Sequence, residues 1–305
     1  MDEHQRVMVA GQPCARMTSD HLVVDVAVEV GPRILGLRLL DGDNMFAELP
    51  EMQLEHDGRT CHLYGGHRVW DAPERPATSW LPDDGPVELI TESLSISVRG
   101  ALRPDGLSKL IRVSLDAASP SATVQHQLRN DGNASVTVAP WAVSMLRPGG
   151  IAVLPFDRIA TDAAGLQAST SRLVLWPYTD LTDPALQWSK HGLMVNTSKS
   201  AAGTDAKNKI GGATTTGWCA YATGGEVLVK LAAPCSSTVD SGATQQVFWE
   251  AQFVELETLG PLTTLEPGQH VEHVEQWRIA RVPVSQDPVE FAALLATGPT
   301  SDPSR

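Results

Sequence analysis

The stretch LVVDVAVEVGPRILGLRLL, residues 22–40, decides the fold class of this chain. β-Branched side chains alternate with other residues over 22–30, Gly31-Pro32 interrupts the run, and an apolar stretch resumes over 34–40. Alternation with a period of two is typical of a β-strand, and Gly-Pro between two such runs marks a turn. The stretch therefore predicts a β-hairpin.

Short strands and turns continue along almost the whole chain. Further strands are predicted over residues 87–90, 94–99, 109–115, 122–129, 135–139, 217–221, 226–231, 246–257 and 270–280. Turns are predicted at residues 41–44, 130–133 and 265–269, and the small, polar residues 196–216 are expected to form a long loop.

Helix is scarce in this pattern. One short helix is predicted over residues 288–297, with Asp287 as its cap. Many short strands without intervening helices predict an all-β sandwich or barrel. We expect an N-terminal extension (1–19), one β-domain (20–282), and a short C-terminal helix with a tail (283–305).

Composition excludes several classes of function. The formal net charge of -13 argues against nucleic acid and anionic membranes as partners. The 4 cysteines are scattered without C-x-x-C spacing, so we expect reduced thiols and no metal site. We find no secretory signal, no membrane-spanning apolar run, and no zincin, α/β-hydrolase or dinucleotide motif. We therefore expect a cytoplasmic protein without a cofactor, and its oligomeric state stays open.

Two acidic residues stand near the end of the strand predicted over 246–257. Glu255 and Glu257 share one face because they are two residues apart. Neighbouring carboxylates repel each other unless they have a counter-charge or a role in chemistry. A solvated strand face is the simpler interpretation, but the apolar flanks Phe253, Val254 and Leu256 indicate a buried strand.

A second candidate segment is YGGHRVW, residues 64–70. His67 exchanges protons near neutral pH, and the guanidinium of Arg68 suits a carboxylate or vicinal hydroxyls. Trp70 offers an apolar face on which a sugar ring can stack. The alternative is a structural loop tied by Arg68 salt bridges.

Three further places have a functional and a structural interpretation. His273 and Glu275 share a strand face with Trp277, and together they line either a cavity or a mixed edge face. Trp141 is either a stacking platform or a core residue. Lys209, in a basic island, either reaches an acidic ligand or belongs to a solvated loop.

Taken together, these residues resemble the galactose mutarotase-like superfamily, over roughly residues 20–282. The resemblance is carried by Gly31-Pro32-Arg33-Ile34, Asn130-Asp131-Gly132 and Leu256-Glu257-Thr258, which occur in the expected order, and by a Gly-Gly-His-Arg-x-Trp segment that is similar to one bacterial branch. The resemblance implies a large antiparallel two-sheet β-supersandwich. It also implies an enzyme that opens and closes aldose rings, with one glutamate as base and one histidine as acid.

Carried over to this chain, the resemblance implies that Glu257 is the base and that Arg68 binds sugar. The chain departs from the family where its His-Gly-Gly reads Tyr64-Gly65-Gly66, and where a second histidine is replaced near Trp141. His67 is then the expected acid, with Tyr64 as the alternative. Glu255 would hold hydroxyls beside Arg68, while Trp70 or Trp141 stacks on the ring.

Three hypotheses about function follow. The first is an aldose 1-epimerase-type isomerase that acts on a small carbohydrate or glycoside. The second is a sugar-binding module without chemistry, which the missing family histidines favour. The third is a lyase or hydrolase acting on a glycan, for which Tyr64 would be the base.

Overall fold

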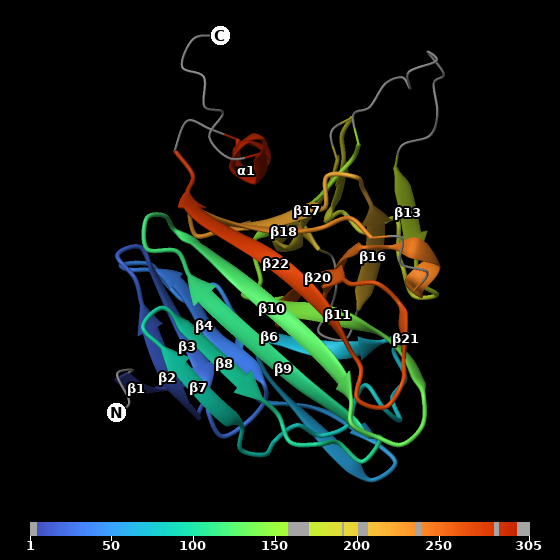
Figure 1. Ribbon diagram of the computed structural model, residues 1–305. Coiled ribbons are helices and arrows are strands. Elements are labelled where there is room, and N and C mark those ends of the chain that lie inside the picture. The colour runs from blue at the N-terminus through green and yellow to red at the C-terminus, as the bar shows by residue number, and fades with distance from the viewer. Residues whose placement is uncertain are drawn as a thin grey trace, which may run out of the picture.

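The computed structural model describes residues 5–157, 171–190, 192–200, 207–235, 239–283 and 287–297. Two large antiparallel sheets pack face to face, and one α-helix lies outside them (Figure 1). This arrangement confirms the predicted all-β supersandwich with a short C-terminal helix.

The first sheet contains 12 of the described strands. Its order is β1 (Gln5–Val9), β2 (Gln12–Thr18), β3 (Leu22–Ala27), β4 (Arg33–Leu39), β6 (Arg59–Ala72), β11 (Val136–Leu146), β20 (Val254–Leu259), β19 (Gln245–Trp249), β16 (Asn208–Ala213) and β13 (Arg172–Leu175), while β5 (Glu48–His56) pairs with β6 and β21 (Thr263–Leu265) with β11. Residues 5–18, which we expected to be an N-terminal extension, thus contribute β1 and β2 to this sheet.

The second sheet contains 10 of the described strands. Its order is β14 (Leu186–Trp188), β15 (Gly192–Asn196), β12 (Ile151–Pro155), β17 (Trp218–Thr223), β18 (Glu226–Ala232), β22 (His270–Arg281), β10 (Ser121–Asn130), β9 (Leu107–Leu115), β8 (Ser95–Arg99) and β7 (Glu88–Glu92). Figure 1 shows β22 running diagonally between β18 and β10.

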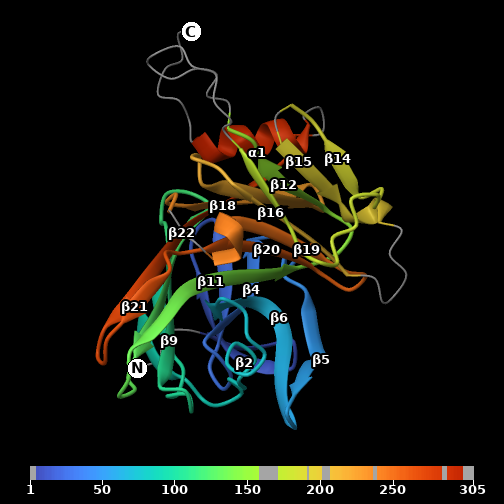
Figure 2. The same cartoon turned by 90° about the vertical axis from the view of Figure 1, so that its right-hand side faces the viewer.

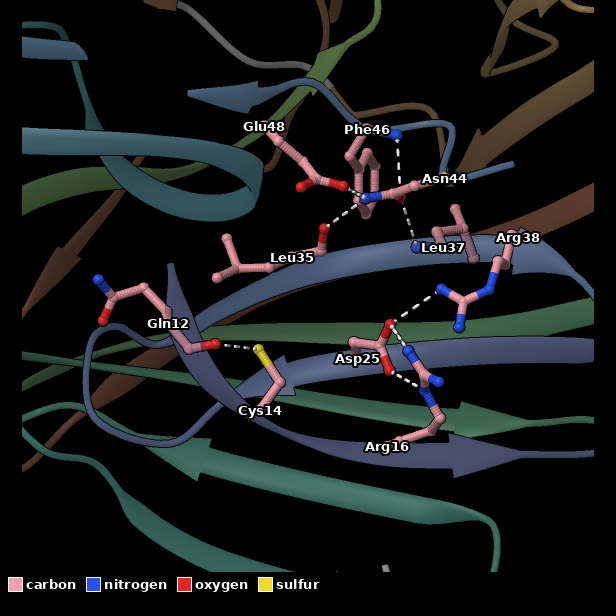
Figure 3. Close-up of polar contacts among 10 residues, drawn as sticks. All are labelled: Gln12, Cys14, Arg16, Asp25, Leu35, Leu37, Arg38, Asn44, Phe46 and Glu48. Atoms are coloured by element: carbon pink, nitrogen blue, oxygen red, sulfur yellow. Dashed lines mark hydrogen bonds and ion pairs between the residues drawn. The ribbon is translucent and has the colours of Figure 1, made fainter. Parts of the chain in front are cut away.

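The predicted hairpin of residues 22–40 forms strands β3 and β4. Its centre is Asp25, which is fully buried and accepts hydrogen bonds from Arg16 Nε (2.6 Å) and Arg38 Nη1 (2.9 Å) (Figure 3). Gly36 pairs with Asp25 across the hairpin and leaves room for this carboxylate. A buried charge is tolerated here because two cations on neighbouring strands surround it.

The main core lies between the sheets and includes Val24, Leu256 and Trp277. The helix α1 (Pro288–Thr297) covers the part of the second sheet's outer face formed by β17, β18 and β22 (Figure 2), and its Ala292 packs in one cluster with Val229. Asp287 caps this helix by accepting a hydrogen bond from the Val289 amide (2.9 Å). The predicted helix and its cap are confirmed.

Two predictions of local structure are corrected. The strand predicted over 246–257 is a hairpin of β19 and β20, because the chain turns where the Glu250 amide donates to the Phe253 carbonyl (3.1 Å). The loop predicted over 196–216 contains the short 3₁₀-helix η1 (Thr197–Lys199) and strand β16, and residues 201–206 lie outside the described residues. Pairing with β19 and β13 overrides the weak strand propensity of this Gly-rich sequence.

No helix within the described ranges is long and apolar enough to cross a membrane.

Candidate functional site

The candidate site lies on the face of the first sheet that is turned away from the second sheet, which we call the outer face. Strands β6, β11 and β20 adjoin there, and the register sets Arg68, Val143 and Glu257 opposite one another. The next row toward one end of these strands contains Trp70 and Trp141. Because side chains alternate between faces along a strand, these rows all project outward.

The row on the other side of Glu257 contains Met145, Glu255, Phe248 and Lys209. Glu255 and Glu257 therefore share the outer face, as the period of two predicts. Lys209 reaches diagonally from β16 toward Glu257, so that one ammonium group lies near both carboxyl groups.

A pocket of about 680 Å³ opens over these rows. Its lining combines aromatic rings with charged groups: Trp70, Trp80, Trp141, Tyr178, Phe248, Phe253, Glu74, Glu250, Glu255, Lys207 and Lys209, together with Met52, Gln53, Leu54 and Leu63. A volume of this size is ordinary for a site that binds a small molecule.

Glu257 is fully buried and is not itself among the residues that line the pocket. Its Oε2 accepts hydrogen bonds from Trp141 Nε1 (2.6 Å) and from Lys209 Nζ (2.9 Å), and both of these side chains line the pocket. Its Oε1 has no hydrogen-bond partner among the described residues. Burial raises the pKa of this carboxyl, and the Lys209 ammonium opposes that rise.

Lys209 is held between two indole rings. Its Nζ lies 4.8 Å from the ring centroid of Trp141 and 4.8 Å from that of Trp176. Attraction between a cation and an aromatic face fixes the ammonium beside the Glu257 carboxylate.

Glu255 has a different environment from Glu257, although it lies on the same strand. Its side chain lines the pocket and is half-buried. Trp141 and Lys209 donate to Glu257 and not to Glu255. Burial, followed by the nearby Glu257 charge, raises the pKa of Glu255 to about 8.

His67 lies on the opposite, inner face of the first sheet, and this corrects the prediction that it faces Glu257. Because β6 is continuous from Arg59 to Ala72, neighbouring residues 67 and 68 point to opposite faces. His67 is fully buried between the sheets, where its Nε2 lies 2.7 Å from His126 Nε2. It is not part of the pocket.

Comparison with solved structures shows what the architecture resembles. A galactose mutarotase-like protein from Lactobacillus casei is 10% identical, with a TM-score of 0.58 over 88% of this chain and 100% of that chain. A protein described as a candidate mutarotase from Salmonella typhimurium is 9% identical, with a TM-score of 0.54 over 90% of this chain and 93% of that chain.

The fold is galactose mutarotase-like.

A TPR-domain containing protein from Parabacteroides distasonis is also similar, at 14% identity and a TM-score of 0.57 over 92% of this chain. This chain spans 50% of that protein's length. No protein-family model and no curated protein matches the sequence. The mutarotase-like likeness is thus a likeness of fold, and the chemistry has to be argued from the residues of this chain.

Within the mutarotase-like fold, the other predicted site residues separate into two groups. Arg68 lies on the outer face but is fully buried beneath Trp70, with its Cζ 4.4 Å from the ring centroid. Trp141 and Lys209, whose alternatives were core and solvated loop, both line the pocket. Tyr64 packs in a separate apolar cluster with Val9 and is not brought to the pocket.

His273 and Glu275 do share a face with Trp277, as predicted, but this is the inner face of the second sheet and not the pocket. Glu275 is fully buried and accepts hydrogen bonds from Trp277 Nε1 (2.7 Å) and Thr258 Oγ1 (2.5 Å). Lys230 Nζ lies 2.9 Å from Glu275 Oε1. Strand β22 lies in the second sheet, so its inward side chains meet the inner face of β20, and the pocket lies on the outer face of that strand.

The buried polar groups between the sheets form one hydrogen-bond network in which each donor and acceptor can be assigned. The His273 carbonyl accepts from His126 Nδ1 (2.9 Å), which leaves Nε2 of a neutral His126 as the acceptor for His67 Nε2–H. His67 Nδ1 then accepts from Ser144 Oγ (2.8 Å), and Ser144 accepts from Lys230 Nζ (3.0 Å). Each of these groups has a hydrogen-bond partner while the histidines are neutral.

The same cluster has the spacing of a metal site. Ligand atoms of His67, His126 and Glu275 lie within 4.8 Å of one another. A cation bound there would displace the His67 Nε2 proton and would face the Lys230 ammonium, which is 2.9 Å from Glu275. The geometry therefore favours a structural hydrogen-bond network over a metal site.

Sequence reasoning missed much of the pocket wall. Trp80, Tyr178, Phe248 and Phe253 line the pocket, yet they come from three separate segments with no shared motif. Trp176-Pro177-Tyr178 was the available signal, because three consecutive ring-bearing residues favour a binding wall. Only tertiary packing shows that this stretch lies beside Lys209.

Proposed function

We propose that the outer-face pocket binds a carbohydrate and that the protein interconverts the anomers of an aldose, with Glu257 as the general base. A sugar ring needs an apolar face for stacking and directed polar groups around its edge. Trp70 and Trp141 meet edge to face, with ring centroids 5.3 Å apart, and provide the apolar wall. Carboxylates and ammonium groups provide the polar rim.

The observation that carries this proposal is the free Glu257 Oε1. A buried acceptor without a partner costs about 1–3 kcal/mol, and a sugar hydroxyl that donates to it would remove this cost. The other oxygen, Oε2, is held by Trp141 and Lys209, so the carboxylate is oriented before substrate arrives.

The test is to measure anomerisation by NMR exchange spectroscopy on a panel of aldoses. We expect Glu257→Gln to slow the reaction by ~10²-fold or more, since a positioned acid or base typically contributes that much. Binding of methyl glycosides, which cannot open, should change little in calorimetry. The exposed Glu266→Gln is the matched control. Equal rates for wild type and Glu257→Gln would remove the base assignment.

A sugar-binding module without chemistry is the second candidate. The position of His67 favours it, because the predicted acid lies on the inner face of the sheet. Tight binding of a sugar with no anomerisation above the spontaneous rate would support the module. The third hypothesis, a lyase or hydrolase using Tyr64, loses its support because Tyr64 is not brought to the pocket.

A further inference from the structure

The proposed reaction needs an acid as well as a base. Opening an aldose ring removes a proton from the anomeric hydroxyl and adds one to the ring oxygen. His67 is excluded as the donor because the first sheet separates it from the pocket. The candidates for the donor are the ionisable groups that line the pocket: Glu74, Tyr178, Lys207, Lys209, Glu250 and Glu255.

Two of these groups are poor donors. The Lys209 ammonium is already engaged by Glu257 (2.9 Å) and held between Trp141 and Trp176. Burial, followed by the charges of Glu257 and Glu74, raises the pKa of Tyr178 further above its ordinary value. A phenol that holds its proton more tightly is a weaker acid for a ring oxygen.

Glu255 has the position that a donor requires. It projects from β20 into the pocket on the same face as Glu257, two residues away along the strand. Consecutive residues on one strand face are about 7 Å apart, which is the scale of a sugar ring with its hydrogen bonds. Trp141 and Lys209 both donate to Glu257 and not to Glu255. The Glu255 carboxyl lines the pocket, where its proton can reach a ligand.

We propose that Glu255 is the proton donor to the ring oxygen, acting with Glu257 across the anomeric centre. This inference rests on the proposed function. The Glu257 carboxylate takes the proton of the anomeric hydroxyl, the C1=O bond forms, and the C1–O5 bond breaks. O5 takes the proton of the Glu255 carboxyl. After rotation about C1–C2, both protons return and the ring closes with the other configuration.

The electrostatics of the pair agree with these roles. Glu257 is stabilised as an anion by Lys209 and Trp141. Burial and the Glu257 charge favour the protonated form of Glu255, and they outweigh the opposing charges of Lys209 and Arg68. One site can supply both an acid and a base at the same pH when two carboxyl groups lie in environments that push their pKa values apart.

The test compares Glu255→Gln, Glu255→Asp and the exposed control Glu266→Gln by NMR exchange across pH 6 to about 10. We expect Glu255→Gln to lower the anomerisation rate by ~10²-fold, and Glu255→Asp, which keeps an acid, to recover part of it. Wild type should lose rate as pH rises through about 8, and Glu255→Gln should lack this alkaline limb. Binding of methyl glycosides checks that each variant is folded.

The outcomes separate the inference from the function beneath it. Wild-type rates or a retained alkaline limb in Glu255→Gln, with Glu257→Gln inactive, would overturn the donor role alone. A wild-type protein that accelerates no aldose would overturn the proposed function and the donor role together.

Discussion

At the scale of single residues, Glu255 and Glu257 show how neighbouring identical side chains acquire different chemistry. They share a strand face, but only Glu257 meets Lys209 and Trp141. The difference arises because Lys209 comes from β16, two strands away, and reaches Glu257 diagonally. The environment of Glu257 is thus set by residues far away in the sequence.

Lys209 is expected to stabilise the fold through Glu257. Lys209→Met leaves a buried carboxylate without its cation, and we expect the free energy of unfolding at pH 8 to fall by about 3 kcal/mol. The loss should shrink as pH falls, because burial raises the pKa of Glu257 and protonation removes the unpaired charge. Glu257→Gln should relieve the loss in the double variant. Urea denaturation measures these values.

Lys207→Met is the matched control because Lys207 lines the same pocket but is exposed. An equal loss of stability in this variant would contradict the role assigned to Lys209.

At the scale of elements, the hairpin of β3 and β4 depends on the fit between Gly36 and Asp25. A Cβ atom at position 36 would lie 2.9 Å from Cβ and Cγ of Asp25, and closer still to one carboxylate oxygen. Asp25 has little freedom to move because Arg16 and Arg38 hold it from two sides (Figure 3).

Gly36→Ala is therefore expected to lower the free energy of unfolding by about 1–3 kcal/mol, the usual cost of overpacking a well-packed site. Gly85→Ala is the control, since a Cβ atom there meets nothing within 4 Å. Thermal unfolding measures both variants. A Gly36→Ala protein as stable as the Gly85→Ala protein would show that the carboxylate can shift.

At the scale of the whole molecule, the first sheet separates two polar systems. The outer face bears the pocket, and the inner face contributes His67 and Ser144 to the hydrogen-bond network shared with the second sheet. That network favours neutral imidazoles. Burial lowers the pKa of His67 and His126, and it lowers the pKa of His273 to about 3.

Stability should consequently fall with acidification. The three histidines stay neutral in the folded state, whereas the unfolded chain binds protons on them below about pH 6.5. Their contribution is present in full above that pH and is lost as pH falls below it, by up to about 1.4 kcal/mol per pH unit for each histidine. Urea midpoints between pH 5 and about 7 measure the slope.

His126→Gln should reduce this slope, and the exposed His270→Gln should leave it unchanged. A slope that His126→Gln does not alter would contradict the assignment to the buried network.

Local patterns were sufficient to predict the hairpin of β3 and β4, the strands β9, β10 and β22, and the C-terminal helix with its cap, but not β1, β2, β5, β6, β12 or β16. The hairpin at residues 22–40 and the helix at 288–297 depend on alternation, turn residues and capping, all of which act over a few residues. The break between β19 and β20 escaped prediction because Glu250 to Phe253 carry no glycine or proline to mark a turn.

The sequence by itself determined that Glu255 and Glu257 share one face of a strand, because that follows from the geometry of an extended chain. Only the tertiary structure decided that Lys209 and the Trp-rich wall join them while His67 does not. Alternation along a strand determines which of its side chains point to the same face. Strand order and sheet packing determine which residues lie opposite them, and both arise from contacts between distant segments. For that reason the acid partner passes from His67 to Glu255 in the function that we propose.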